Sequence, residues 1–276
     1  MRKTLQMNEA QILRDYVSED VYSRLNANRH VCYLLPDGEC LIAFHFCDIQ
    51  NPLQKDDKVC IYCGKDDFVF ITDNKKCAKH LAGINENIDS KTQLYDFFLS
   101  LTDSDVYDLE KIEDRITDIE DIILTDKRTN TGNSASIIKI RRELLKMKRY
   151  YEQLSLITSD LAANTDKAFS EEMQKRFAAA DRRMDYLLNS VLHLREYITQ
   201  VREAYQAEID IEQNQIMKIF TVITAVFLPL TLIVGWYGMN VKMPEYKWAY
   251  GYPYVIALSA VVAISCIIYF KVKKWF

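Results

Sequence analysis

The chain has 276 residues, and 35 Lys and Arg against 39 Asp and Glu give it a formal net charge of −4. This balance gives no electrostatic reason to expect nucleic acid as a partner. The apolar residues are unevenly spread, because no Asp, Glu, Lys or Arg occurs from Ile219 to Val241 or from Trp248 to Phe270. A helix needs roughly 20 apolar residues to cross a bilayer. Composition therefore excludes a purely soluble protein and a transporter with many spans.

The first residues, MRKTLQMNEAQILRDY, pass from a basic start into polar and acidic residues instead of an apolar run. We therefore expect no secretory signal, and a cytoplasmic location for the first two hundred residues. The seven cysteines fit a reduced compartment, in which buried thiols act as small apolar side chains. We favour this interpretation over a zinc site at Cys60 and Cys63, because these residues would point to opposite faces of a strand.

Two segments near the start have the pattern of β-hairpins. Residues 29–47 turn at Pro36-Asp37-Gly38, and residues 57–72 turn between Gly64 and Asp67. Residues 75–87 and 90–101 then have the pattern of helices, so we expect helices that cover a sheet. Residues 1–102 are predicted to form a cytoplasmic α/β domain.

Long helices are predicted from residue 103 onward. The stripe of an amphipathic helix consists of Val106, Leu109, Ile112, Ile116, Ile119 and Ile123. Residues 126–133 interrupt it, a second helix begins near Ser134, and residues 164–166 mark another turn. Neither Gly nor Pro occurs from Glu171 to Leu228. This predicts one helix that runs from a cytoplasmic stalk, residues 103–214, straight into the membrane.

The rest of the chain divides into four parts. We expect a first transmembrane helix at 215–240, an outer loop at 241–252, a second transmembrane helix at 253–271 and a basic tail at 272–276. The lysines at the tail, Lys271, Lys273 and Lys274, predict that it is cytoplasmic. With two spans, both termini of this multi-pass protein of the cell (inner) membrane are then cytoplasmic. The predicted fold class is an α+β cytoplasmic domain whose long helices continue into two C-terminal transmembrane helices.

One face of the first transmembrane helix carries most of its hydroxyl and amide groups. We call it the polar stripe; at alternating spacings of three and four it contains Asn214, Met217, Thr221, Thr224, Leu228, Thr231 and Gly235. Such residues are typical of closely packed membrane helices, and they suit a water-filled path equally well. Because one helix cannot enclose a pore, the second interpretation requires several copies of the chain around an axis.

The segment Tyr237-Gly238-Met239-Asn240, followed by Met243-Pro244-Glu245, resembles the CorA family of magnesium transporters. In that family a Gly-Met-Asn signature ends the first span, and the resemblance here covers residues 210–276. It implies a homopentameric, funnel-shaped channel in membrane lipid, lined by five copies of the first span. The implied activity is passive Mg²⁺ uptake, driven by membrane potential and gated by cytoplasmic Mg²⁺. Neither an enzyme nor a cofactor is expected, because Mg²⁺ is the transported and regulatory ion.

Mg²⁺ gives up its water reluctantly, so neutral oxygens that hold the hydrated ion through its waters suit a channel. The resemblance implies that the ion contacts Asn240 and the Gly238 carbonyl at the outer mouth, and Thr231, Gly235 and Asn214 along the path. Tyr237 and Met239 would pack the signature. The rest of the lining would consist of Met217, Phe220, Thr221, Thr224 and Leu228.

An apolar gate is expected where Met217 and Phe220 or Thr221 narrow the path. The family usually has an aliphatic residue near position 220, so Phe220 departs from its pattern. Near the cytoplasmic end, Glu208, Asp210 and Glu212 would form carboxylate rings in a pentamer, or would lie on a solvated helix face.

Two alternatives stay open at this point. A relative with the same architecture would carry Zn²⁺, Co²⁺ or Ni²⁺ instead. A membrane-anchored helical scaffold would account for the long helix and the two anchors, but not for the polar stripe or the Gly-Met-Asn segment. ATP-driven transport is not predicted, because the chain has no Walker lysine motif and no glycine-rich phosphate loop.

Overall fold

A computed structural model describes residues 2–27, 30–35, 38–125, 131–165, 168–239, 248–273 and 275. Several predicted features lie outside these ranges: the turn residues Pro36 and Asp37, most of the break at 126–133, Asn240, the outer loop up to residue 247 and Lys274. The chain divides into two compact units, Met1–Glu203 and Ala204–Phe276, which are described separately.

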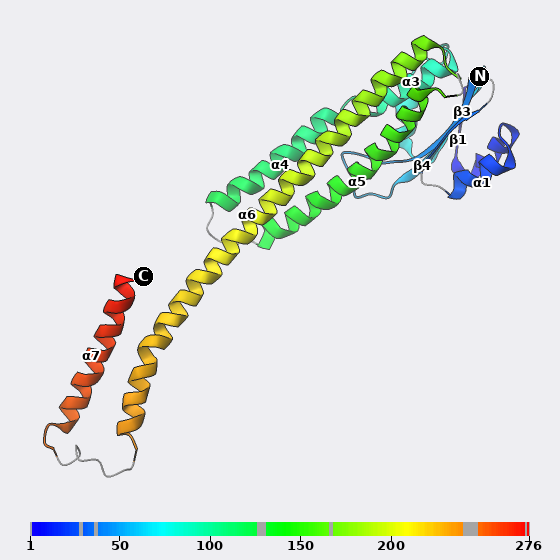
Figure 1. The fold of residues 1–276 in the computed structure, drawn as a ribbon. Coiled ribbons are helices and arrows are strands. Elements are labelled where there is room, and N and C mark those ends of the chain that lie inside the picture. Colours follow the sequence, from blue (N-terminus) through cyan, green and yellow to red (C-terminus); the bar gives the residue numbers. More distant parts are fainter. Residues whose placement is uncertain are drawn as a thin grey trace. The chain divides into compact units, whose positions relative to one another are not determined.

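A five-stranded sheet in the order β1-β5-β4-β3-β2 forms the centre of the first unit (Figure 1). Its strands are β1 (Arg2–Leu5), β2 (Val31–Leu35), β3 (Glu39–Phe46), β4 (Asp57–Cys63) and β5 (Phe68–Thr72). The pairs β2–β3 and β4–β5 are antiparallel, which confirms the two predicted hairpins. Strand β1 pairs parallel to β5 and was not expected from the sequence.

Both faces of the sheet are covered. On one face, η1 (Met7–Asp15) and α1 (Glu19–Ala27) pack Leu13 and Leu25 against a cluster that includes Leu41 of β3 and Val69 of β5. On the other, α2 (Lys75–Ala82), α3 (Ser90–Leu101) and α5 (Thr131–Ala163) contact the strands. This double burial explains why β3, β4 and β5 are apolar along nearly their whole length instead of alternating.

Most of the cysteines are packed in the core of the first unit. All seven are free thiols, and five of them are buried. Cys60 lies in the cluster under η1 and α1, whereas Cys63 lies beside Ser90 at the start of α3, so the two point to opposite faces as expected. Burial raises the pKa of the Cys60 thiol to about 11. Within the described part of the chain, no three His, Cys, Asp or Glu side chains are placed to hold a metal ion.

Most helices begin and end close to the predicted positions, but α2 ends at Ala82 instead of residue 87 and α4 shows an error of phase. Helix α3 covers the predicted residues, and α5 begins three residues before Ser134. In α4 (Asp105–Thr125) Val106 was predicted to be buried, but it is 37% exposed. Asp105 and Asp108 are buried in its place, because the inward face of the first turn lies one residue away from Val106.

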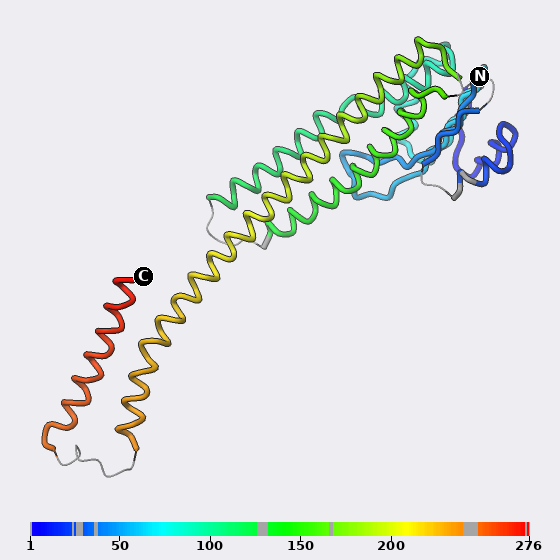
Figure 2. Tube along the Cα trace, in the orientation of Figure 1, coloured from blue at the N-terminus to red at the C-terminus, as the bar shows by residue number. Residues whose placement is uncertain are grey.

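Helices α4, α5 and α6 (Glu171–Tyr237) run side by side in the first unit (Figure 2). The buried seam between α5 and α6 includes Leu154, Ile157, Met184 and Leu187. Polar bonds flank it: the Thr158 hydroxyl lies 3.0 Å from a carboxylate oxygen of Asp181. In the first unit, burial of α6 against its own chain continues to Val201, and beyond that point Val222 is the one buried residue among the described residues of the helix. Tertiary packing within the chain therefore stabilises mainly the first part of α6.

The second unit consists of the remainder of α6 and of α7 (Gly251–Val272). Both helices are long and apolar enough to cross a membrane, and only 6% of the most apolar window of each is buried within the chain. Pro229 lies inside α6 without ending it, as membrane helices allow. Apolar helices with so little burial within the chain need lipid or other protein to cover them.

Candidate functional site

The polar stripe of α6 is exposed along its whole length in the single chain. All seven of its residues are exposed, and Met217 and Leu228 expose 63% and 69% of their surface. The opposite face is apolar and exposed in part, with Ile223 at 48% and Phe227 at 62%, while Val222 is buried. Hydrocarbon suits the second face but not a line of hydroxyl and amide groups.

The three threonines of the stripe share one geometry. Each hydroxyl donates to the backbone carbonyl four residues earlier: Thr221 to Met217, Thr224 to Phe220 and Thr231 to Phe227, all at 2.8 Å. This bond occupies the hydroxyl hydrogen and leaves the oxygen lone pairs free to accept. Water bound to a cation donates hydrogen bonds outward. The stripe is therefore a line of acceptors that suits a hydrated cation.

The two glycines near the end of α6 have different constraints. A Cβ on Gly238 would lie 2.9 Å from the Val234 carbonyl oxygen, so the chain itself requires glycine at this position. A Cβ on Gly235 would meet no atom within 4 Å. Nothing in the described part of the chain explains why residue 235 is small, which is consistent with close approach of another helix from outside.

The signature begins where α6 ends. The Gly238 amide donates to the Val234 carbonyl at 2.8 Å, and the Met239 amide to the Trp236 carbonyl at 3.3 Å. Met239 is 44% exposed in the single chain, and Tyr237 is half-buried. Asn240 lies outside the described residues.

The residues expected near the cytoplasmic end of the path are also on α6. Phe220 is 62% exposed, and Asn214 is exposed one further turn and a half toward the first unit. Asp210 accepts a hydrogen bond from the Gln206 amide nitrogen at 3.1 Å, while Glu208 and Glu212 are half-buried.

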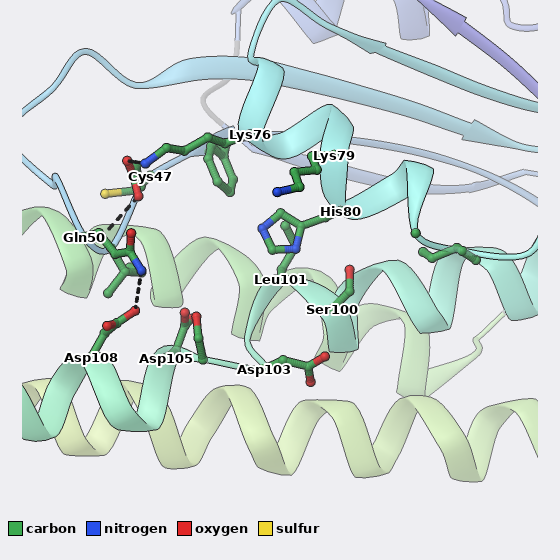
Figure 3. Close-up of a pocket in the computed structure, with 16 residues that line it drawn as sticks. Cys47, Gln50, Lys76, Lys79, His80, Ser100, Leu101, Asp103, Asp105 and Asp108 are labelled. Carbon is green, nitrogen blue, oxygen red and sulfur yellow. Dashed lines mark hydrogen bonds and ion pairs between the residues drawn. The ribbon is translucent and has the colours of Figure 1, made fainter.

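A separate cavity of about 580 Å³ lies in the first unit (Figure 3). It is formed by the segment after β3, by α2 and by the start of α4. Asp105 is buried at its edge and accepts a hydrogen bond from the Tyr151 hydroxyl at 2.8 Å. Burial raises the pKa of Asp105 to about 7, and the bond from Tyr151 opposes this rise only partly.

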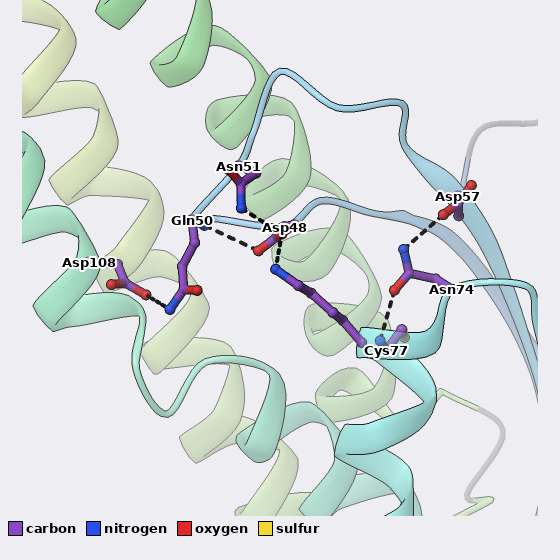
Figure 4. Close-up of polar contacts among 8 residues, drawn as sticks. Asp48, Gln50, Asn51, Asp57, Asn74, Cys77 and Asp108 are labelled. Atoms are coloured by element: carbon purple, nitrogen blue, oxygen red, sulfur yellow. Dashed lines mark hydrogen bonds and ion pairs between the residues drawn. The ribbon is translucent and has the colours of Figure 1, made fainter.

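The other carboxylates of this cavity already have partners. Asp48 pairs with Lys76, and Asp108 accepts from the Gln50 amide at 3.4 Å (Figure 4). Asp108 also pairs with Lys111 at 2.9 Å. Asp103 lies 3.4 Å from Arg183. These bonds connect the β3–β4 connection, α2 and α4. The polar side chains around the cavity therefore form a network that stabilises the first unit.

Sequence reasoning did not find this network. Asp48, Lys76 and Asp105 come from separate elements, and only the helical phase of α4 could have suggested that Asp105 turns inward. By contrast, the polar stripe was predicted because its residues share one helix, whose 3.6-residue period fixes their common face.

Comparison with known proteins shows one family. The model of the family described as CorA-like Mg²⁺ transporter protein matches residues 20–274. The cobalt/magnesium transport protein CorA of Thermotoga maritima is 30% identical over 183 residues, which are 66% of this chain and 52% of that protein. The magnesium transport protein CorA of Yersinia pseudotuberculosis is 49% identical over 74 residues, 26% of this chain and 23% of that protein. The chain thus spans about half or less of the length of these relatives.

Two solved structures share the fold. The CorA magnesium transporter of Methanocaldococcus jannaschii gives a TM-score of 0.79 at 19% identity, over 96% of this chain and 87% of that one. Full-length CmaX gives 0.76 at 19% identity, over 96% and 88%. These likenesses confirm the coarse architecture: a sheet and helices followed by two apolar C-terminal helices.

The raised pKa of Asp105 predicts a pH dependence of stability. Its folded-state pKa of about 7 lies above its ordinary value of 3.8, so ionisation costs free energy in the folded state. The free energy of unfolding should therefore fall as pH rises from about 4 to about 7. Asp105→Asn keeps an acceptor for Tyr151 and removes the charge. Above pH 7 it should raise the free energy of unfolding by up to a few kcal/mol.

Thermal unfolding of the full chain in detergent, followed between about pH 5 and pH 8, measures this effect. The matched control is Asp103→Asn, which changes a carboxylate whose side chain is 71% exposed. A pH profile that is the same for wild type and Asp105→Asn would contradict the assignment.

Proposed function

The chain belongs to the family of CorA-like Mg²⁺ transporter proteins, and on that premise we propose that it conducts Mg²⁺ passively into the cytoplasm. The family is one of transporters, in agreement with the sequence-based expectations that the chain is not an enzyme and that Mg²⁺ is the transported ion instead of a cofactor. The proposal goes beyond family membership in naming the direction, the driving force and the residues of the path.

The acceptor geometry of the polar stripe carries this proposal. Three threonine oxygens along α6 have their hydrogens committed to the helix backbone and their lone pairs free. They would hold Mg²⁺ by its waters, so the ion would not need to be stripped. No Asp, Glu, Lys or Arg occurs from Ile219 to Val241. A divalent ion gains about 4.6 kcal/mol per 100 mV on entry, which is enough to drive uptake.

A path for water requires several copies of the stripe around one axis, and we propose a homopentamer. Gly235 has open space around it and Met217, Thr224 and Leu228 are exposed, so neighbouring copies of α6 would cover this face. The apolar face with Ile223 and Phe227 would meet α7 or lipid. At the mouth, five Asn240 side chains would form the outer ring, with the Gly238 carbonyls beneath it.

The proposal includes control by cytoplasmic Mg²⁺, which rests on the family resemblance. It assigns no sensor residues, because the carboxylates around the cavity of the first unit already have partners. Co²⁺ is a second candidate ion, because the relative from Thermotoga maritima is named a cobalt/magnesium transport protein. A site that holds an ion through its water shell discriminates weakly between divalent ions of similar size.

Asn240→Ala tests the proposed path. It removes five acceptors from one ring, each worth about 0.5–1.5 kcal/mol, so Mg²⁺ flux should fall at least about tenfold. The measurement is Mg²⁺ entry into liposomes that contain the purified protein. The matched control is Ile223→Ala on the apolar face, which should conduct like the wild type. Normal flux through an assembled Asn240→Ala protein would show that the ring is not part of the path.

The proposed orientation places both termini in the cytoplasm and the loop between the two spans outside. A single cysteine introduced as Glu245→Cys, in a variant without the native cysteines, should react with an impermeant thiol reagent on intact cells. The same reagent should reach Lys274→Cys only after the membrane is opened. Labelling of Lys274→Cys on intact cells would reverse the orientation.

A further inference from the structure

A second cavity of the first unit has no part in the proposed ion path. Its volume is about 300 Å³, and it lies between the end of β3, the β3–β4 connection and α5. The side chains that matter here are His45 of β3, Lys55 and Asp56 of the connection, and Lys146, Arg149 and Gln153 of α5.

The charges around this cavity are unbalanced. Three permanent cations face one carboxylate, a local excess of positive charge in a chain whose net charge is −4. Lys146 is held by Asp56, with 3.1 Å between its ammonium nitrogen and a carboxylate oxygen. Across the described ranges, neither the Lys55 ammonium nor the Arg149 guanidinium has a hydrogen bond or an ion pair. Two cations are therefore left without a partner at one cavity.

The wall that carries these cations is held in place by Gln153. Its amide oxygen accepts from the His45 backbone N–H at 3.1 Å, and its amide nitrogen donates to the Arg149 backbone carbonyl at 2.9 Å. Gln153 thereby joins α5 to β3 at the level of the cavity. Lys146 also donates to the Gln54 carbonyl of the connection. The backbone of both walls is fixed before any ligand arrives, which lowers the entropic cost of binding.

A compartment that is apolar in part adjoins the cationic one. The neighbouring cavity, of about 410 Å³, shares Arg149 and Gln153 with the first and presents Leu156 of α5 and Leu188 of α6. Leu156 is 51% exposed. The rest of its lining is polar, namely His30, Ser155 and Glu152, whose carboxylate pairs with Lys148. Arg149 thus lines both compartments; we call the two together the Arg149 cleft and the one with the two leucines its apolar compartment.

We propose that the Arg149 cleft binds a phosphorylated organic molecule of the nucleotide class. Its phosphates meet Lys55, Lys146 and Arg149, because a guanidinium donates two parallel hydrogen bonds to phosphate and lysines add point charges. Its ring system lies against Leu156 and Leu188. The volume of each compartment lies within the range of small-molecule sites. The proposal does not depend on ion transport, since binding is measured without any flux.

Calorimetric titration of the full chain in detergent with ATP and with pyrophosphate, both without Mg²⁺, tests the proposal. ATP should bind once per chain and more tightly than pyrophosphate. Lys55→Gln and Arg149→Gln should each weaken both ligands at least about tenfold, because each removes a charge-assisted contact. Leu156→Ser should weaken ATP and leave pyrophosphate unchanged. These three side chains are exposed, so the substitutions spare the core.

The matched control is Lys139→Gln, which removes the same charge from an exposed position of α5 outside both cavities. It should leave both affinities unchanged. Equal weakening by Lys139→Gln and Lys55→Gln would reduce the binding to diffuse charge attraction and overturn the site. Absence of binding to the wild type at millimolar ligand would overturn it as well. ATP affinity no greater than that of pyrophosphate would overturn the assignment of the apolar compartment.

Discussion

A helix satisfies its own backbone hydrogen bonds, and this property allows α6 to lie in water over its first part and to cross hydrocarbon over its second. The helix continues from Glu171 to Tyr237 without a break. Its first part is held by a buried seam with α5 that includes Leu154 and Leu187. The polar stripe lies beyond this seam, and its residues are exposed in the single chain.

The polar stripe sets the second constraint. A threonine hydroxyl that donates to the preceding turn leaves no unpaired hydrogen in a membrane helix. Its oxygen lone pairs can still accept hydrogen bonds, and donors for them are favourable. Lipid chains supply none, and water or a hydrated ion does. The exposed stripe, and the open space that a Cβ on Gly235 would meet, support the proposed neighbouring copies. This is the physical link between membership of a transporter family and the proposed path.

Most features that depend on neighbouring residues in the sequence were predicted correctly, whereas features that depend on contacts between distant segments were not. The hairpins followed from their turns, and the uninterrupted stretch before Pro229 predicted α6 because helix breakers are absent there. Val106 was misplaced because a stripe read from spacing alone can be one residue out of phase in its first turn. Strand β1 was missed because four residues, RKTL, carry too little alternation to stand out.

The sites divide in the same way. The stripe was visible in the sequence because one helix carries all of it. The network around Asp105 and the Arg149 cleft were not visible, since the residues of each come from strands, connections and helices that only the folded sheet brings together. In the sequence, Lys55 and Arg149 do not differ from other charged residues. They become candidate ligand-binding residues only because the structure places both at one cavity.

The proposed path requires that several copies of α6 turn their stripes toward one axis. The most direct measurement is the mass of the purified particle in mild detergent by native mass spectrometry. The account predicts five copies of the 32.3 kDa chain, with Thr224→Val and Ile223→Ala proteins assembling alike. A monomer or dimer that persists across protein concentrations would contradict it, because the polar stripe would then face lipid.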